Sequence, residues 1–147
     1  GSGFVRAAIH YTKMGEYDKA LRYVERARHY IDTDIKLTEF YMVFYTATKR
    51  WEELDAFIDN TIMTNSLAYQ IYPSYVLGYL LEEAPEMMMR YLEKGMYYFN
   101  NDPSYAATAV TIAERYNQVD QAKAMFERLK GRLTYPVDAY VDTLNTM

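Results

Sequence analysis

A period of 34 residues runs through this chain and constrains its fold more than any other feature. In the first copy, Tyr17, Ala20, Val24 and Ala27 follow a turn at Gly15 and share one helical face. We call this face the stripe. The residues 34, 68 and 102 positions after the stripe residues, and after residues of the preceding helix, are again mostly apolar or small. Such a fixed spacing indicates an internal repeat of helical hairpins. From positions 8, 11, 20 and 24 it leads to Met42, Val76, Val110; Tyr45, Tyr79, Ala113; Leu54, Met88, Ala122; and Ile58, Leu92, Phe126.

The period divides most of the chain into four units, and no segment shows the apolar/polar alternation of a strand. We therefore predict an all-α protein. Repeats are expected at 4–34, 35–68, 69–102 and 103–136, with a further first helix or a capping helix at 137–147. The helices are expected at 4–14, 17–31, 35–48, 51–64, 85–99, 103–115 and 119–131, and one more precedes 85.

Capping residues and prolines refine these boundaries. Asp34 is a candidate N-cap, and Asp102 is another because Pro103 follows it at a first helical position. Pro73 lies inside an expected helix, which either begins near Tyr72 or is kinked there. Gly1-Ser2-Gly3 is interpreted as a cloning remnant, and since both ends of the rest read as helices cut short, we expect a piece of a longer chain.

Stacking follows from the size of the repeat. A two-helix unit of 34 residues cannot bury its apolar face alone, so neighbouring units must pack on one another. Small stripe residues such as Ala20 and Ala122 allow close helix approach, and large ones such as Phe126 fill the remaining space. The expected architecture is an α-solenoid.

Gly15, Tyr17, Ala20 and Ala27, with Ala8 and Tyr11 before them, resemble the pattern of tetratricopeptide repeats, which have the same period. The resemblance extends over 4–136 and is strongest in the first unit, whereas the second and third units carry Lys49 and Glu83 at the turn glycine, and Pro85 at the aromatic position. It implies a right-handed superhelix whose first helices line a concave groove that binds peptides or partner proteins.

The expected groove mixes apolar and charged side chains. One version of the family grips acidic C-termini with lysines and asparagines, but Val5, Ile9, Phe40, Gln70 and Ser74 occupy the matching positions here. We therefore expect a non-catalytic scaffold that binds a largely apolar partner segment, such as an amphipathic helix. The groove residues would be Arg6, Ile9, Lys13, Glu39, Phe40, Val43, Leu77, Leu80 and Leu81.

A second resemblance supports an alternative function. The stretch 122–144, with Pro136 inside it, is similar to a pentatricopeptide unit, and those repeats read single-stranded RNA. Against this, 35–68 holds three Lys or Arg and five Asp or Glu, the opposite of the charge balance that RNA grooves need. We keep RNA as the alternative partner.

Other classes of function find little support in the sequence. There is no cysteine, so disulfides and thiolate metal sites are excluded, and no apolar run is long enough to insert in a membrane. His10 and His29 are 19 residues apart and lack a metal-binding spacing. No phosphate loop or nucleophile motif is present either. We expect no catalytic residue, no metal and no cofactor.

Three further groups of residues allow two readings each. Met88 is expected in the core, although the run 87–89 would also suit an adaptable binding surface. Tyr11, Tyr45 and Tyr79 are expected to pack between hairpins, with a ligand ladder as the alternative. Lys19, Arg22 and Arg26 are expected on a solvated face, with binding of phosphate or an acidic protein as the alternative. The open ends of the array also offer a surface for self-association.

Overall fold

The computed structural model describes residues 2–27, 35–64 and 71–147, and every regular element in those ranges is helical. The predicted all-α class is therefore confirmed for the part of the chain that the structure describes. The predicted cap at Asp34 and the predicted end of the helix 17–31 lie outside the described residues.

Two compact units make up the chain, residues 1–85 and residues 86–147. The division falls inside the third predicted repeat, 69–102, so the compact units do not coincide with whole repeats.

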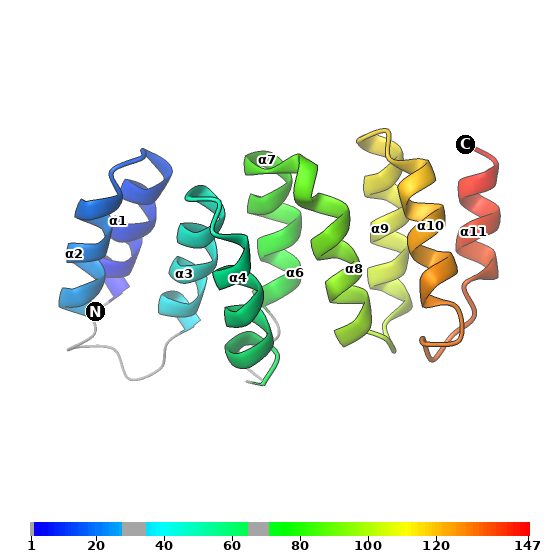
Figure 1. Cartoon of the computed structure of the whole chain (residues 1–147), viewed down its shortest axis with the longest axis horizontal. Helices are drawn as coiled ribbons and strands as arrows, with labels where there is room; N and C mark the ends of the chain where they lie inside the picture. The colour runs from blue at the N-terminus through cyan, green and yellow to red at the C-terminus, as the bar shows by residue number, and fades with distance from the viewer. Residues whose placement is uncertain (1, 28–34, 65–70) are drawn as a thin grey trace. The chain divides into compact units, whose positions relative to one another are not determined.

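The first unit is built from antiparallel helical pairs joined by short turns (Figure 1). Helix α1 packs on α2 and α3, and α3 packs on α4 and α6. Pro73 lies in α6. Residues 65–70, directly before α6, lie outside the described residues, so the two predicted alternatives, a helix start near Tyr72 or a kink there, both stay predictions. The elements are α1 (Ser2–Lys13), α2 (Tyr17–Ala27), α3 (Ile35–Ala47), α4 (Trp51–Phe57), the π-helix η1 (Ile58–Ile62), α6 (Ile71–Tyr75), the π-helix η2 (Val76–Leu80) and α7 (Leu81–Glu83).

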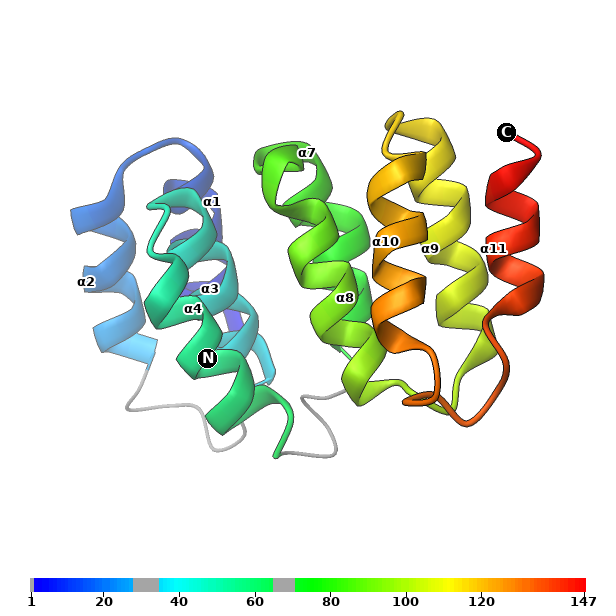
Figure 2. The same ribbon diagram turned by 45° about the vertical axis from the view of Figure 1, so that its right-hand side comes forward.

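The second unit holds α8, α9, α10 and α11, and α10 packs on α8, α9 and α11 (Figure 2). The cap predicted at its first turn is confirmed, because an Asp102 carboxylate oxygen accepts a 2.9 Å hydrogen bond from the Ser104 N–H and Pro103 follows directly. A 3₁₀ turn, η3 (Pro85–Met87), precedes α8. The helices are α8 (Met88–Tyr98), α9 (Pro103–Arg115), α10 (Val119–Leu129) and α11 (Asp138–Asn145).

Three turns share one backbone geometry, in register with the period of the sequence. Gly15, Lys49 and Asn117 have φ values of 81°, 57° and 55°, in the left-handed region. The next residue in each turn donates a 2.8 Å backbone hydrogen bond that closes the end of the preceding helix. Lys49 therefore keeps the turn geometry although it replaces the glycine. The bonded pairs are Glu16 to Tyr11, Arg50 to Tyr45 and Gln118 to Ala113.

The connection at Ala84, between α7 and η3, is different. The helix before it continues to Glu83, and the Ala84 N–H donates a 2.8 Å bond to the Leu80 carbonyl, as in an ordinary helical turn. Ala84 then leaves the helix with φ −141° and ψ 67°, and Pro85 begins the next turn at once. Since no residue here needs a positive φ, Glu83 can occupy the position of the turn glycine.

The predicted stripe forms the core. The residues at 8, 20 and 24, and those 34, 68 and 102 residues further along the chain, are all buried. None of them has more than 6% of its surface exposed. Met88 is among them, so its predicted place in the core is confirmed. The other two stripe positions are less well buried. Pro85, the counterpart of Tyr17 two periods on, is exposed, and so is Thr61, the counterpart of Ala27 one period on. The buried residues are Ala8, Met42, Val76, Val110; Ala20, Leu54, Met88, Ala122; and Val24, Ile58, Leu92, Phe126.

Candidate interaction surface

The candidate surface lies on the first helices of the first unit, α1, α3 and α6. Helix α3 is held between the other two, and Phe40 and Phe44 from α3 join the core formed by the first hairpin. Tyr17 fixes the spacing, because its ring centroid lies 5.9 Å from that of Phe44 and its hydroxyl donates a 3.4 Å hydrogen bond to the Ala47 carbonyl. Helix α3 thus packs on both α1 and α6, and we call these three helices the layer of first helices.

The nine predicted groove residues divide by exposure. Arg6 and Lys13 are exposed, and Ile9, Glu39 and Leu77 are half-buried. The other four are buried in the core and do not form part of a surface: Phe40 and Leu80 at 0% exposed, Val43 at 3% and Leu81 at 5%. The expected groove is corrected accordingly.

The reason for this correction is visible at Phe40, which is offset by one period from the exposed Arg6. The ring of Phe40 lies 5.5 Å from that of Phe44, and both belong to the cluster that includes Val5, Ala8, Ala20 and Val24. Equivalent sequence positions therefore face different surroundings, because the first hairpin covers α3 on a side where no described helix covers α1.

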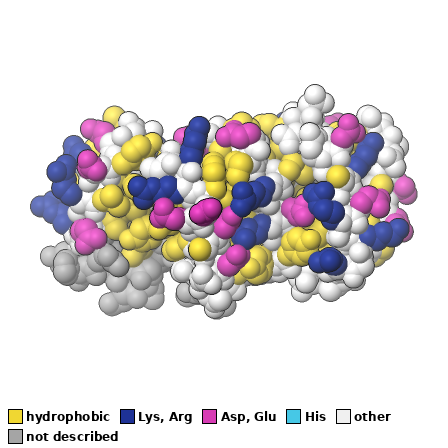
Figure 3. Space-filling view, in the orientation of Figure 1, with side chains coloured by type: hydrophobic (Ala, Val, Ile, Leu, Met, Phe, Trp, Pro, Cys, Tyr) yellow, Lys and Arg dark blue, Asp and Glu magenta, His cyan; other side chains and the backbone are white. Residues whose placement is uncertain are grey.

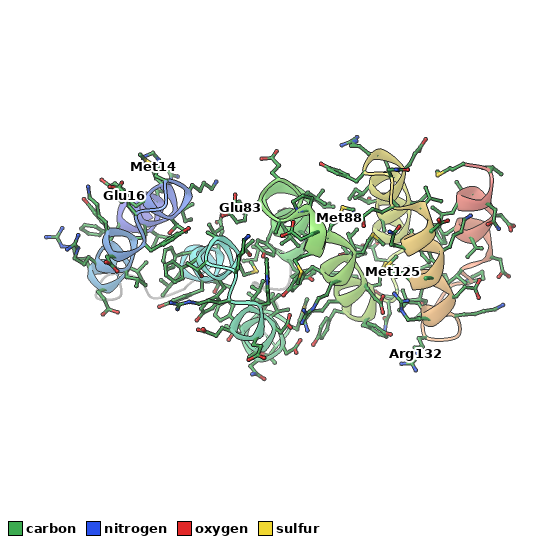
Figure 4. The ribbon with its side chains drawn as sticks, turned by 45° about the horizontal axis from the view of Figure 1, so that its top comes forward. Met14, Glu16, Glu83, Met88, Met125 and Arg132 are labelled. Atoms are coloured by element: carbon green, nitrogen blue, oxygen red, sulfur yellow. The ribbon has the colours of Figure 1, made fainter. Side chains whose placement is uncertain are left out.

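Lys13 and Tyr79 connect α1 with η2. The Lys13 ammonium lies 5.4 Å from the centroid of the Tyr79 ring, close enough for a cation–π contact. The Tyr79 hydroxyl oxygen is buried and has no hydrogen-bond partner among the described residues. Burial, and then the charge of Glu83, raise the pKa of the Tyr79 phenol above its ordinary value. Figure 4 shows Glu83 on α7, and Met14 and Glu16 beside the turn that follows α1.

The predicted tyrosine series makes ring contacts that join helices within hairpins. The ring centroid of Tyr11 lies 5.2 Å from that of Tyr23, and that of Tyr45 lies 5.9 Å from that of Phe57. These distances suit aromatic packing. The contacts lie within hairpins, however, and not between adjacent hairpins as predicted.

A polar pair that sequence reasoning missed lies beneath this layer. The hydroxyls of Thr46 and Tyr75 are hydrogen-bonded to each other in the interior, and Thr46 also donates to the Met42 carbonyl at 2.7 Å. Burial raises the pKa of the Tyr75 phenol, so this hydroxyl stays protonated. The bond joins α3 to α6 and holds the layer of first helices together.

The second unit has a separate cleft of about 370 Å³ where the chain leaves α10. The hydroxyl oxygen of Tyr135 is buried there without a hydrogen-bond partner among the described residues, and burial raises its pKa to about 12. The sequence analysis placed this stretch between the expected helices 119–131 and 137–147 and predicted no site there. The cleft is lined by Lys130, Gly131, Leu133, Thr134, Tyr135, Pro136, Val137 and Asp138.

Sites of other kinds were sought in the same ranges of the chain. The described residues contain no group of three or more His, Cys, Asp or Glu side chains placed to hold a metal ion. His10 is exposed on α1, and His29 lies outside the described residues. Among the described helices none has both the length and the apolar character needed to cross a bilayer.

Comparisons with known proteins do not assign the chain to a family. No protein-family model, curated protein or solved structure matches it. The class that the structure defines is thus an all-α protein with repeated turn geometry, and its repeat family and its function are proposals.

Proposed function

We propose that the chain is a tetratricopeptide-like helical-repeat protein that binds a peptide or amphipathic segment of a partner protein. The binding surface would be the layer of α1, α3 and α6, without catalysis and without a cofactor. The observation that carries the proposal is that Ile9 and Leu77 are both partly exposed, and that Ile9 lies between the exposed charged residues Arg6 and Lys13 of α1.

This composition suits a partner with a few apolar anchors. The half-buried Ile9 and Leu77 offer apolar area to a side chain of the partner, and the charged residues around them stay hydrated at the rim. Ile9 and Leu77 are offset by two periods of 34 residues, and Val43 between them is buried. The proposed contacts are therefore at α1 and at η2, which continues from α6.

Support for the repeat family comes from the turns and the core. Three turns at offsets of one and two periods share a positive φ and the same hydrogen bond, and the residues at 8, 20 and 24 and their counterparts in every predicted repeat are buried. Tetratricopeptide repeats have this period, so the resemblance and the local geometry support the same proposal.

The test is a selection of binding peptides followed by two matched substitutions. Peptides would be selected from a displayed random library on the purified chain, and their affinities measured for Leu77→Ser and for Leu21→Ser. Leu21 is 39% exposed on α2, outside the proposed surface, so it provides the same chemical change as a control. We expect Leu77→Ser to weaken binding about tenfold, as loss of one apolar anchor does, and Leu21→Ser to leave it unchanged. Failure to select any binder, or equal affinity for both variants, would overturn the proposal.

A further inference from the structure

Charge is unevenly distributed within the first unit. Residues 4–27 carry five Lys or Arg and three Asp or Glu, a net charge of +2, whereas residues 35–85 carry three and seven, a net charge of −4. A protein that is acidic as a whole therefore has a basic first hairpin.

The cations of this hairpin lie around a row of aromatic rings. The Lys19 ammonium is 4.3 Å from the centroid of the Tyr11 ring, and the Arg26 guanidinium carbon is 6.0 Å from that of Tyr23. The His10 ring contacts Tyr11 as well, at 5.5 Å between centroids. We call five basic side chains of α1 and α2 the basic edge: Arg6, His10, Lys19, Arg22 and Arg26, of which Lys19 is half-buried and the other four are exposed. Figure 3 shows Lys and Arg side chains gathered over α2.

The basic edge has basic residues at positions where the next repeat has buried aromatic residues. Arg6 and His10 correspond to Phe40 and Phe44, which are 0% and 3% exposed in the core shared with the first hairpin. An apolar neighbour packed on α1 in the same way would bury Arg6 without a partner, at a high desolvation cost. The edge is therefore suited to water or to a charged partner.

Within the part of the chain that the structure describes, no ion pair joins the basic edge to an Asp or Glu. The ion pairs formed there include Arg50 with Glu53 and Arg128 with Glu93. The rings of Tyr11 and Tyr23 pack against each other and carry Lys19 and Arg26 on their faces, so they are not arranged to stack bases. This arrangement favours carboxylates over a nucleic acid.

We infer that the basic edge binds an acidic segment of a partner protein. Its exposed cations provide the complementary charge, and the aromatic rings hold Lys19 and Arg26 in place beneath the segment. The edge shares Arg6 with the rim of the proposed apolar surface, but Lys19, Arg22 and Arg26 lie on α2 away from the anchors Ile9 and Leu77. The inference therefore goes beyond the proposed function and can be tested independently through α2.

The test measures binding of a labelled polyglutamate peptide of about 20 residues by fluorescence anisotropy, at about 50 and 150 mM salt. The variant is Lys19→Glu/Arg22→Glu/Arg26→Glu. The control, Arg115→Glu/Lys130→Glu/Arg132→Glu, makes the same change in net charge at three exposed positions of the second unit. A milder variant with glutamine at 19, 22 and 26 replaces the first if circular dichroism shows that charge reversal unfolds the chain.

We expect the variant to weaken binding at least about tenfold and the control to change it less than about twofold. Amide shifts on peptide addition should be confined to residues 3–26. Equal loss in variant and control would show attraction by net charge alone and overturn the inference. If an oligouridylate of equal charge bound more tightly than the peptide, the partner of the edge would be RNA. If the chain formed a salt-sensitive dimer that the variant abolished, the partner would be a second copy of the chain. Either result would also overturn it.

Discussion

Two glycines of the first unit make a sharp test of the turn geometry, because the same methyl group should act in opposite directions at the two sites. Gly15 has φ +81° in the first hairpin turn, and Gly78 lies in helical backbone in η2. A Cβ added at either site meets no atom within 4 Å. Steric contacts therefore do not contribute, and only backbone conformation differs.

The expected magnitudes follow from that difference. Alanine in the left-handed region destabilises the folded chain by about 1–2 kcal/mol. Alanine also lowers the entropy of the unfolded chain, which offsets roughly 0.4–1 kcal/mol of this destabilisation. Gly15→Ala should thus lower the free energy of unfolding by about 0.5–1 kcal/mol. Gly78→Ala should raise it by a similar amount, because alanine is favoured over glycine in a helix by about 0.5–1 kcal/mol.

Urea unfolding followed by circular dichroism would measure both variants against the parent chain. In thermal melts the midpoints should shift in opposite directions, by roughly 2–4 °C per kcal/mol for a chain of this size. Stabilisation by Gly15→Ala, or equal destabilisation by both, would refute the assigned turn and with it the shared geometry of Gly15 and Lys49.

Three further predictions concern packing, capping and titration. Ala20 is fully buried, so Ala20→Leu should cost about 1–3 kcal/mol in a thermal melt, whereas Ala56→Leu at an exposed position of α4 should change stability by less than about 0.5 kcal/mol. Asp102→Ala removes the bond to the Ser104 N–H and should cost about 1 kcal/mol in urea unfolding, and no loss would refute its role as a cap. The pKa of Tyr135 is raised from 10.0 to about 12, so the folded chain holds this proton more tightly and stability should fall as pH rises through that interval. Comparing unfolding of the parent chain with Tyr135→Phe across the interval checks the sign, and an identical fall in both would contradict it.

The core could be predicted from the sequence because burial follows the helical stripe directly. Ala20 and Val24, and their counterparts one, two and three periods on, are buried as their pattern indicated. The turn at Lys49 was less certain, since a lysine has no special preference for positive φ. It adopts φ 57° because the helices on either side of it fix the path of the chain.

The connection at Ala84 could not be predicted from the repeat pattern. Glu83 in place of glycine indicated a departure from the repeat, but the longer first helix and the sharp exit at Ala84 depend on hydrogen bonds that leave no sequence pattern. The π-helical stretches Ile58–Ile62 and Val76–Leu80 were missed for the same reason, because their residue types do not differ from those of an α-helix.

The candidate surface was predicted only in part. A position in a repeat defines a direction from the helix axis, and what lies in that direction depends on the neighbouring elements. Arg6 and Phe40 are equivalent in the period, yet one is exposed and the other is buried against the first hairpin. The buried Thr46–Tyr75 pair was missed because neither residue belongs to the stripe.

Hydrogen exchange with a selected peptide would test the proposed binding surface most directly. Exchange would be compared with and without the peptide at saturation, segment by segment along the chain. The account predicts slower exchange in α1 and in the continuous stretch 71–83, with α2 and α4 unchanged. Slowing confined to α2 and α4, or to the second unit, would contradict the assignment of the first helices as the binding surface.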